Sequence, residues 1–244
     1  MISERQLSSC FDSFWLHHFP LLNPTLIRRF NAEQKERLLR ADGSPVLPIP
    51  MGQNVERFDV VAELAFETAR ERYRKKKGEV PDIAAAIHRA LSKIEFMRGG
   101  SEIATVSKSE TAEADALAGA YEVLFDSIAE QGNVCFRPRI KGAGILDQTE
   151  ADFCTTTTLF EVKTVNRNLQ SGDMRQVLCY LVAGLGSHDY KWTDYCIFNP
   201  RLAVMYSGNI EELLAYLSGR TSHECIADVL DALMEREQPL EARF

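Results

Sequence analysis

The sequence lacks the cysteine spacings that mark a disulfide framework or a zinc site. Its six cysteines stand singly within apolar stretches, and no two of them form a Cys-x-x-Cys pair. This usage is typical of reduced, buried thiols in an intracellular protein. It argues against zinc and iron–sulfur centres, because both need clustered ligands. The five histidines likewise show no spacing typical of metal ligands.

Long apolar runs are also missing. The longest apolar stretch, around residues 178–185, is too short to cross a bilayer. The first residues do not read as a secretory signal, because Glu4 and Asp12 interrupt their apolar character. We therefore expect a soluble, cytoplasmic protein with no membrane partner.

The chain has no excess of positive charge. It contains 28 basic and 35 acidic side chains, which gives a formal net charge of -7. Proteins that coat nucleic acid without specificity are usually basic, so any contact with phosphates requires a local basic patch. The basic run at residues 70–77 fits the solvated end of a helix better than such a patch.

The first 100 residues predict a mainly helical region to which no chemical motif assigns a role. Apolar periodicity indicates helices over residues 31–40, 58–77 and 83–94, with a turn-rich loop at residues 42–50. The early aromatic residues are expected in the core rather than at an interface. They are Phe11, Phe14, Trp15 and Phe19.

Residues 101–210 predict an α/β core, and residues 211–244 predict a helical C-terminal extension. We expect helices at 109–130 and from Asp173 onward, and two tail helices between residues 209 and 237 that are separated near Gly219. The expected strands lie at residues 134–140, 151–154, 159–164, 195–198 and 202–206.

The chemistry is concentrated around Asp152, Glu161 and Lys163. Alternate residues of a strand share a face, so Glu161 and Lys163 point the same way. Either they form a buried ion pair, or Glu161 binds a metal while Lys163 faces substrate. A hairpin brings Asp152 toward Glu161, and two neighbouring carboxylates repel each other unless a cation lies between them. Mg²⁺, or Mn²⁺ in its place, prefers such oxygen ligands.

These residues resemble the motif of the PD-(D/E)xK nuclease superfamily. The first half of the motif is Ala151-Asp152, and the second is Glu161-Val162-Lys163. The resemblance implies a restriction-endonuclease-like core, with a mixed central sheet flanked by helices. It implies that Asp152, Glu161 and the backbone carbonyl of Val162 bind the metal, and that Lys163 is the catalytic lysine.

Gln176 and Tyr180 lie at i and i+4 of the following helix and share one of its faces. This pair resembles the Gln-xxx-Tyr motif of the RecB-like branch of that superfamily. The resemblance implies that Gln176 lies near the metal and that Tyr180 approaches the DNA backbone. The alternative is a solvated glutamine and an aromatic residue at the edge of the core.

Many members of the family carry a helical glutamate before the first strand. Glu122 fits this position best, and Glu113 is its competitor because it shares the stripe of Leu117 and Tyr121. Arg137 and Arg139 alternate on the first expected strand. They either flank DNA or face solvent, and the sequence favours neither alternative.

The expected function is that of a Mg²⁺-dependent endodeoxyribonuclease. Its setting, by analogy alone, is a bacterial or phage-related defence or DNA-processing complex. DNA is the expected partner, and the helical N- and C-terminal regions could bind another protein or a second copy of the chain. The alternative is a catalytically silent nuclease-fold subunit that binds DNA or scaffolds a partner protein.

Overall fold

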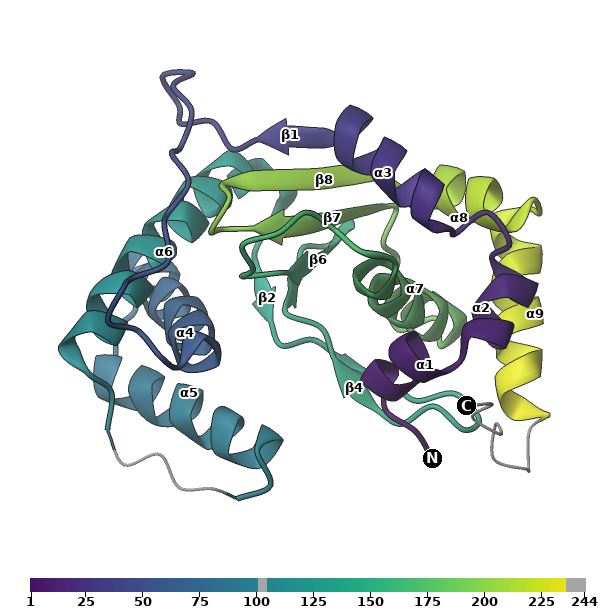
Figure 1. Ribbon diagram of the computed structural model, residues 1–244, viewed down its shortest axis with the longest axis horizontal. Coiled ribbons are helices and arrows are strands. Elements are labelled where there is room, and N and C mark those ends of the chain that lie inside the picture. Colours follow the sequence, from purple (N-terminus) through teal and green to yellow (C-terminus); the bar gives the residue numbers. More distant parts are fainter. Residues whose placement is uncertain (101–104, 236–244) are drawn as a thin grey trace.

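The computed structural model describes residues 1–100 and 105–235, which form an α/β structure around a six-stranded mixed sheet (Figure 1). Strands β6 and β7 are parallel, and the other neighbouring pairs of this sheet are antiparallel. The strand order is β1 (Lys35–Arg37), β8 (Val204–Asn209), β7 (Asp194–Asn199), β6 (Thr158–Val162), β5 (Phe153–Cys154) and β2 (Cys135–Phe136). Strands β3 (Arg139–Ile140) and β4 (Thr149–Glu150) form a separate antiparallel pair.

One face of the sheet is covered by helix α7 (Ser171–Gly186), which connects the parallel strands β6 and β7. A parallel pair needs such a crossover connection. Helices α1 (Glu4–Cys10) and α9 (Ser222–Met234) pack on α7. Helix α2 (Asp12–His18) contacts α9, and α8 (Ile210–Ser218) packs between α9 and β8. The ends of the described chain therefore lie on the α7 side of the sheet (Figure 1).

The opposite face is covered by α4 (Phe58–Lys76) and α6 (Lys108–Ser127), and α5 (Ile83–Met97) packs on α4 (Figure 1). A short 3-10 turn, Ala129–Gln131, follows α6. Aromatic rings fill the space beneath these helices. Phe153 stacks on Phe160 with ring centroids 4.5 Å apart, and Tyr121 meets Phe198 edge to face. These contacts hold β5 and β6 in register against the helical layer.

The expected α/β class is confirmed, as are most of the expected helices and three of the expected strands. The helices at residues 58–77, 83–94 and 109–130 and the helix around Asp173 are present, as are the strands around residues 159–164, 195–198 and 202–206. The two tail helices are separated at Gly219, whose φ of 71° is left-handed and suits a helix C-cap. The expected end of the second tail helix at residue 237 lies outside the described residues.

The helix expected at residues 31–40 is wrong. Helix α3 occupies Pro24–Glu33 instead, and the next residues form the edge strand β1. Pro24 is the first residue of this helix, a position where a proline loses no hydrogen bond. The three residues of β1 are all charged and exposed, so they give no alternating pattern.

The single strand expected at residues 134–140 is also wrong. The chain forms β2 and β3 instead, and they belong to different sheets. Arg137 between them has a φ of 53°, and Pro138 has no N–H to donate to a ladder. The strand expected at residues 151–154 is shorter, since β5 contains only Phe153–Cys154.

Burial agrees with most expectations about the apolar residues. Phe14, Trp15 and Phe19 are buried, and Phe11 is partly buried against the same core. Four cysteines are buried, but Cys10 and Cys135 are exposed, and all six are free thiols. In the described ranges, no helix combines the length and the apolar character needed to cross a membrane. The division at residues 100 and 210 stays a prediction, although β1 and α4 of the first segment pack with the core.

A buried ion pair joins α6 to the turn between β7 and β8. The Arg201 guanidinium lies 2.5 Å from Glu113, and the side chains of both residues are almost fully buried. Removing one partner of a buried pair leaves the other charge without compensation. Glu122, on the same helix, instead forms a half-exposed pair with Arg72 at 3.2 Å.

We therefore expect Glu113→Ala to lower the free energy of unfolding by about 3–5 kcal/mol, against about 0–1 kcal/mol for the control Glu122→Ala. Urea denaturation followed by circular dichroism measures both values. Equal small losses for the two variants would contradict the role given to Arg201 and Glu113.

Candidate active site

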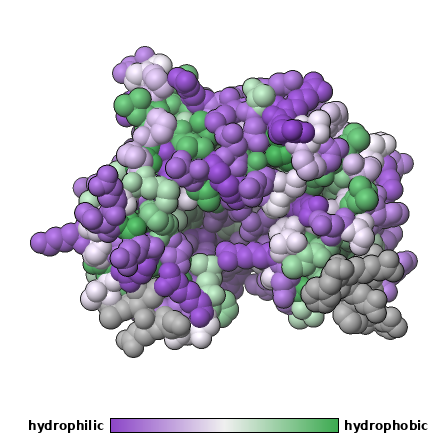
Figure 2. Space-filling view, in the orientation of Figure 1, coloured by the Kyte–Doolittle hydropathy of each residue, from purple (hydrophilic) through white to green (hydrophobic). Residues whose placement is uncertain are grey.

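A cavity of about 810 Å³ opens between the α4–α5 layer and the elements around α1, β4 and α7. Figure 2 shows the molecule hollowed near its centre, with hydrophilic residues around the opening. Acidic side chains outnumber basic ones in the lining, so the cavity favours a cation and disfavours a bare polyanion. The acidic residues are Glu4, Asp59, Glu63, Glu150, Asp152 and Glu161, and the basic ones are Arg5, Lys93, Arg137 and Lys163.

Pairing between β5 and β6 brings Asp152 and Glu161 together. Phe153 lies opposite Phe160, and Cys154 lies opposite Leu159. Continuing this antiparallel register by one residue sets Asp152 opposite Glu161. Residues in such positions share a face, with Cβ atoms about 4.5–5.5 Å apart. The two carboxylates therefore converge from adjacent strands, as the sequence predicts.

Asp152 is held by contacts from two directions. Its Oδ2 accepts a hydrogen bond of 2.7 Å from the backbone N–H of Val162, at the end of β6. Its Oδ1 accepts a hydrogen bond of 2.9 Å from the Arg137 guanidinium. The first contact fixes the carboxylate beside the Glu-x-Lys strand, and the second leaves it paired with a positive charge.

Glu161 is buried, with only 4% of its surface exposed. Its Oε1 accepts a hydrogen bond of 2.8 Å from Lys163, but its buried Oε2 has no partner among the described residues. Burial raises the pKa of Glu161 to about 7 against the opposing effect of Lys163, and the Asp152 carboxylate contributes to the rise. A buried carboxylate oxygen without a partner is costly, and such exceptions mark functional sites.

Lys163, Gln176 and Tyr180 form a chain of hydrogen bonds that starts at Glu161. The Lys163 ammonium donates to Glu161 and to the side-chain oxygen of Gln176. The Gln176 amide donates to the Tyr180 hydroxyl at 2.7 Å. Burial alone would lower the pKa of Lys163, but the negative charge of Glu161 outweighs it and raises that pKa. Lys163 therefore remains a cation fixed beside the two carboxylates.

These residues fit a divalent metal ion. Asp152 and Glu161 offer hard oxygen ligands on one face, Val162 lines the same cavity, and one buried oxygen of Glu161 is uncommitted. Mg²⁺ and Mn²⁺ bind such carboxylates and retain positions for water and phosphate. Thiol and imidazole ligands are absent from the described lining of the cavity.

The structure does not bring the two helical glutamate candidates to the cavity. Glu122 pairs with Arg72 at the helix surface, and Glu113 pairs with buried Arg201. Helix α4 instead contributes the carboxylates of Asp59 and Glu63 to the described lining of the cavity. Glu63 pairs with Arg137 and lies 3.8 Å from Lys93.

Glu63 was missed because the segment carrying it has no recognised motif. A signal was nevertheless present, since Glu63, Glu67 and Glu71 recur every four residues. Such a row places three carboxylates on one helix face, where they repel one another unless cations compensate them. Arg89 compensates Glu67 and Glu71, and Arg137 pairs with Glu63.

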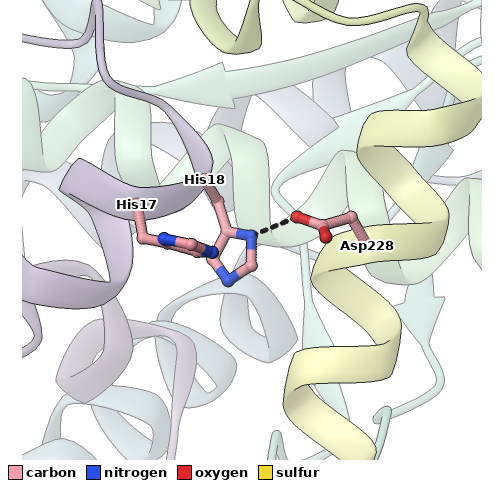
Figure 3. A group of neighbouring side chains, drawn as sticks. All are labelled: His17, His18 and Asp228. Carbon is pink, nitrogen blue, oxygen red and sulfur yellow. Dashed lines mark hydrogen bonds and ion pairs between the residues drawn. The ribbon is translucent and has the colours of Figure 1, made fainter.

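A second group of ligand-type side chains lies where α2 meets α9 (Figure 3). Atoms of His17, His18 and Asp228 lie within 4.8 Å of one another. Asp228 Oδ2 is 2.6 Å from His18 Nδ1 and 2.5 Å from the Arg220 guanidinium. The carboxylate is therefore already neutralised by arginine, and the group links the two helices. Sequence spacing could not predict this group, because Asp228 is 210 positions from His18.

No family model matches this chain, and neither does any curated protein or solved structure. The functional inference therefore depends on the geometry of the chain's own residues.

Binding of a metal ion at this site can be tested without a substrate. We expect isothermal titration calorimetry to detect Mn²⁺ binding, with affinity reduced about tenfold or more in Asp152→Asn and in Glu161→Gln, because each removes a charged ligand. The control Asp228→Asn should bind Mn²⁺ as the unaltered protein does. If Mn²⁺ binding were weakened in the Asp228 variant alone, the metal site would lie at the α2–α9 contact instead.

Proposed function

We propose that this protein is a Mg²⁺-dependent nuclease that hydrolyses DNA phosphodiester bonds, and that it belongs to the RecB-like branch of the PD-(D/E)xK superfamily. One observation carries the proposal. Asp152 and Glu161 converge beside Lys163 at the end of the β5–β6 pair, and a buried oxygen of Glu161 has no partner in the described parts of the chain.

The arrangement of elements supports the finer fold proposal, a restriction-endonuclease-like core. Helix α6 covers one face of the sheet, Asp152 directly precedes β5 and Glu161 lies on β6, and α7 covers the other face before β7. This is the order of elements in which the superfamily places its motif residues, and Gln176 and Tyr180 lie on α7 beside Lys163.

Each residue of the site has a separate role in the proposed reaction. Asp152 and Glu161 would hold the cation, with the Val162 carbonyl as a further ligand. Bound there, a divalent cation activates water and neutralises charge on the scissile phosphate. Lys163 can donate a hydrogen bond to the attacking water or to a phosphoryl oxygen as negative charge develops. Gln176 orients Lys163, and buried Tyr180 orients Gln176. This last contact favours positioning over direct contact of Tyr180 with DNA.

The charge of the molecule bears on how DNA is reached. A net charge of -7 and an acidic cavity do not attract DNA over a broad surface. We propose that a partner protein, or a second copy bound through the helical N- and C-terminal regions, supplies additional basic surface. Defence or DNA-processing complexes are a setting for such a module, on analogy alone.

The test is incubation of the purified protein with plasmid, linear duplex DNA, single-stranded DNA and RNA, with Mg²⁺ and with a chelator. We expect Mg²⁺-dependent cleavage of DNA, including closed circles. The rate should fall by about 10²–10³-fold or more in Asp152→Ala, Glu161→Ala and Lys163→Ala, because each removes charge that acts on the transition state.

Glu122→Gln is the matched control, since Glu122 lies at the surface of α6 and should not affect cleavage. Unchanged cleavage by the three site variants would refute the assignment. Cleavage of RNA alone would support the proposed active site but show that its substrate is RNA and not DNA.

A further inference from the structure

Arg137 enters the cavity through an unusual backbone conformation. Its φ of 53° is left-handed, and its N–H donates to the carbonyl of Asp152 at 2.9 Å. The chain therefore turns between β2 and β3, so that the Arg137 side chain is only 14% exposed while that of Arg139 is 78% exposed. A non-glycine residue in this conformation is costly, and such strain gathers at functional sites.

The guanidinium of Arg137 bridges two acidic side chains. It donates to Asp152 Oδ1 at 2.9 Å and also to Glu63 on α4. It lies over the Phe66 ring, 4.0 Å from the ring centroid. The cation is thus fixed at the carboxylate that, on the proposed function, binds the metal ion.

This contact conflicts with a metal ion bound by Asp152. A guanidinium held against a carboxylate that also binds a divalent ion would lie within a few ångströms of a double positive charge, and the repulsion is strong in a partly buried site. The conflict ends if Arg137 finds another anion. A phosphate group entering the cavity is such a partner, because a guanidinium binds phosphate oxygens in a bidentate manner.

We propose that Arg137 leaves Asp152 when that carboxylate takes the cation, and then binds a phosphate group of the nucleic-acid substrate while Glu63 remains beside it. Without substrate, Arg137 competes with the cation for Asp152. With substrate, the same side chain stabilises the complex. Cation binding and substrate binding therefore strengthen each other, and this coupling must be reciprocal. The inference rests on the proposed nuclease site.

The test compares Arg137→Gln and Arg137→Lys with the matched control Arg139→Gln. In titrations with Mn²⁺ alone, Arg137→Gln should bind the ion about 5- to 150-fold more tightly than the unaltered protein, the usual range of a coupling between two sites. The Mn²⁺ affinity of Arg137→Lys should lie between that of Arg137→Gln and that of the unaltered protein. Arg139→Gln should leave the Mn²⁺ affinity unchanged.

Oligonucleotide binding is then measured by fluorescence anisotropy in the slow-cleaving Lys163→Ala background. With Mn²⁺, Arg137→Gln should weaken binding and lower the salt-dependence slope by about one, as expected for the loss of one phosphate contact. Without Mn²⁺, Arg137→Gln should have little effect on oligonucleotide binding, because Arg137 then remains paired with Asp152.

Two results would overturn the inference. One is unchanged or weaker Mn²⁺ binding by a folded Arg137→Gln, which would make Arg137 a structural link between α4 and β5. The other is Mn²⁺-dependent oligonucleotide binding that the substitution does not alter. Circular dichroism checks that each variant folds. If Arg137→Gln does not fold, the same two binding measurements on Arg137→Lys test the inference. A protein that passes both binding tests but cleaves nothing would refute the nuclease activity and leave the Arg137 inference standing.

Discussion

The structure depends on a pair of like charges placed opposite each other. Asp152 and Glu161 converge at one position of the β5–β6 pair, and Glu161 is buried there. Two carboxylates in such a setting repel each other, and burial adds the cost of removing them from water. Lys163 and Arg137 compensate part of this charge, yet one buried oxygen of Glu161 remains without a partner among the described residues. On the proposed function, a divalent cation bound between the two carboxylates would relieve this repulsion.

The fold holds the two carboxylates together because packing on the opposite face of the sheet fixes the register of β5 and β6. Phe153 and Phe160 stack on the face opposite the site, against the aromatic residues of α4 and α6. A shift by one residue would move these rings to the other face, so their burial specifies the register strongly. On the site's own face, α7 presents Gln176 to Lys163, and Tyr180 accepts a hydrogen bond from Gln176. Packing energy from the core thus maintains a costly arrangement of charges.

Part of this arrangement could be predicted from the sequence because it depends on local spacing. Glu161 on β6 and Lys163 directly after it lie two residues apart in extended backbone, and Gln176 and Tyr180 lie one helical turn apart on α7. Glu63 and Arg137 could not be placed in the same way. The position of Glu63 depends on how α4 packs, and that of Arg137 depends on a left-handed turn that no strand pattern predicts. The positions of Glu113 and Glu122 depend on tertiary packing in the same way, since buried Arg201 and half-exposed Arg72 determine where these glutamates point.

Glu63 and Arg137 also change how the acidic character of the molecule is understood. The overall negative charge argues against broad attraction of nucleic acid, but the cavity holds Lys93, Arg137 and Lys163 among its acidic residues. On the proposed function, a cation bound there would shift the local charge toward positive at the place where a phosphate would enter, if Arg137 is released at the same time. Metal binding and substrate recognition are then two parts of one electrostatic event.

The most direct measurement is anomalous X-ray diffraction from crystals soaked in Mn²⁺. We expect an anomalous peak between the carboxylates of Asp152 and Glu161, at coordination distance from an oxygen of each, with the Arg137 guanidinium displaced from Asp152. A cavity without a peak, or a peak confined to His17, His18 and Asp228, would contradict the proposed metal site.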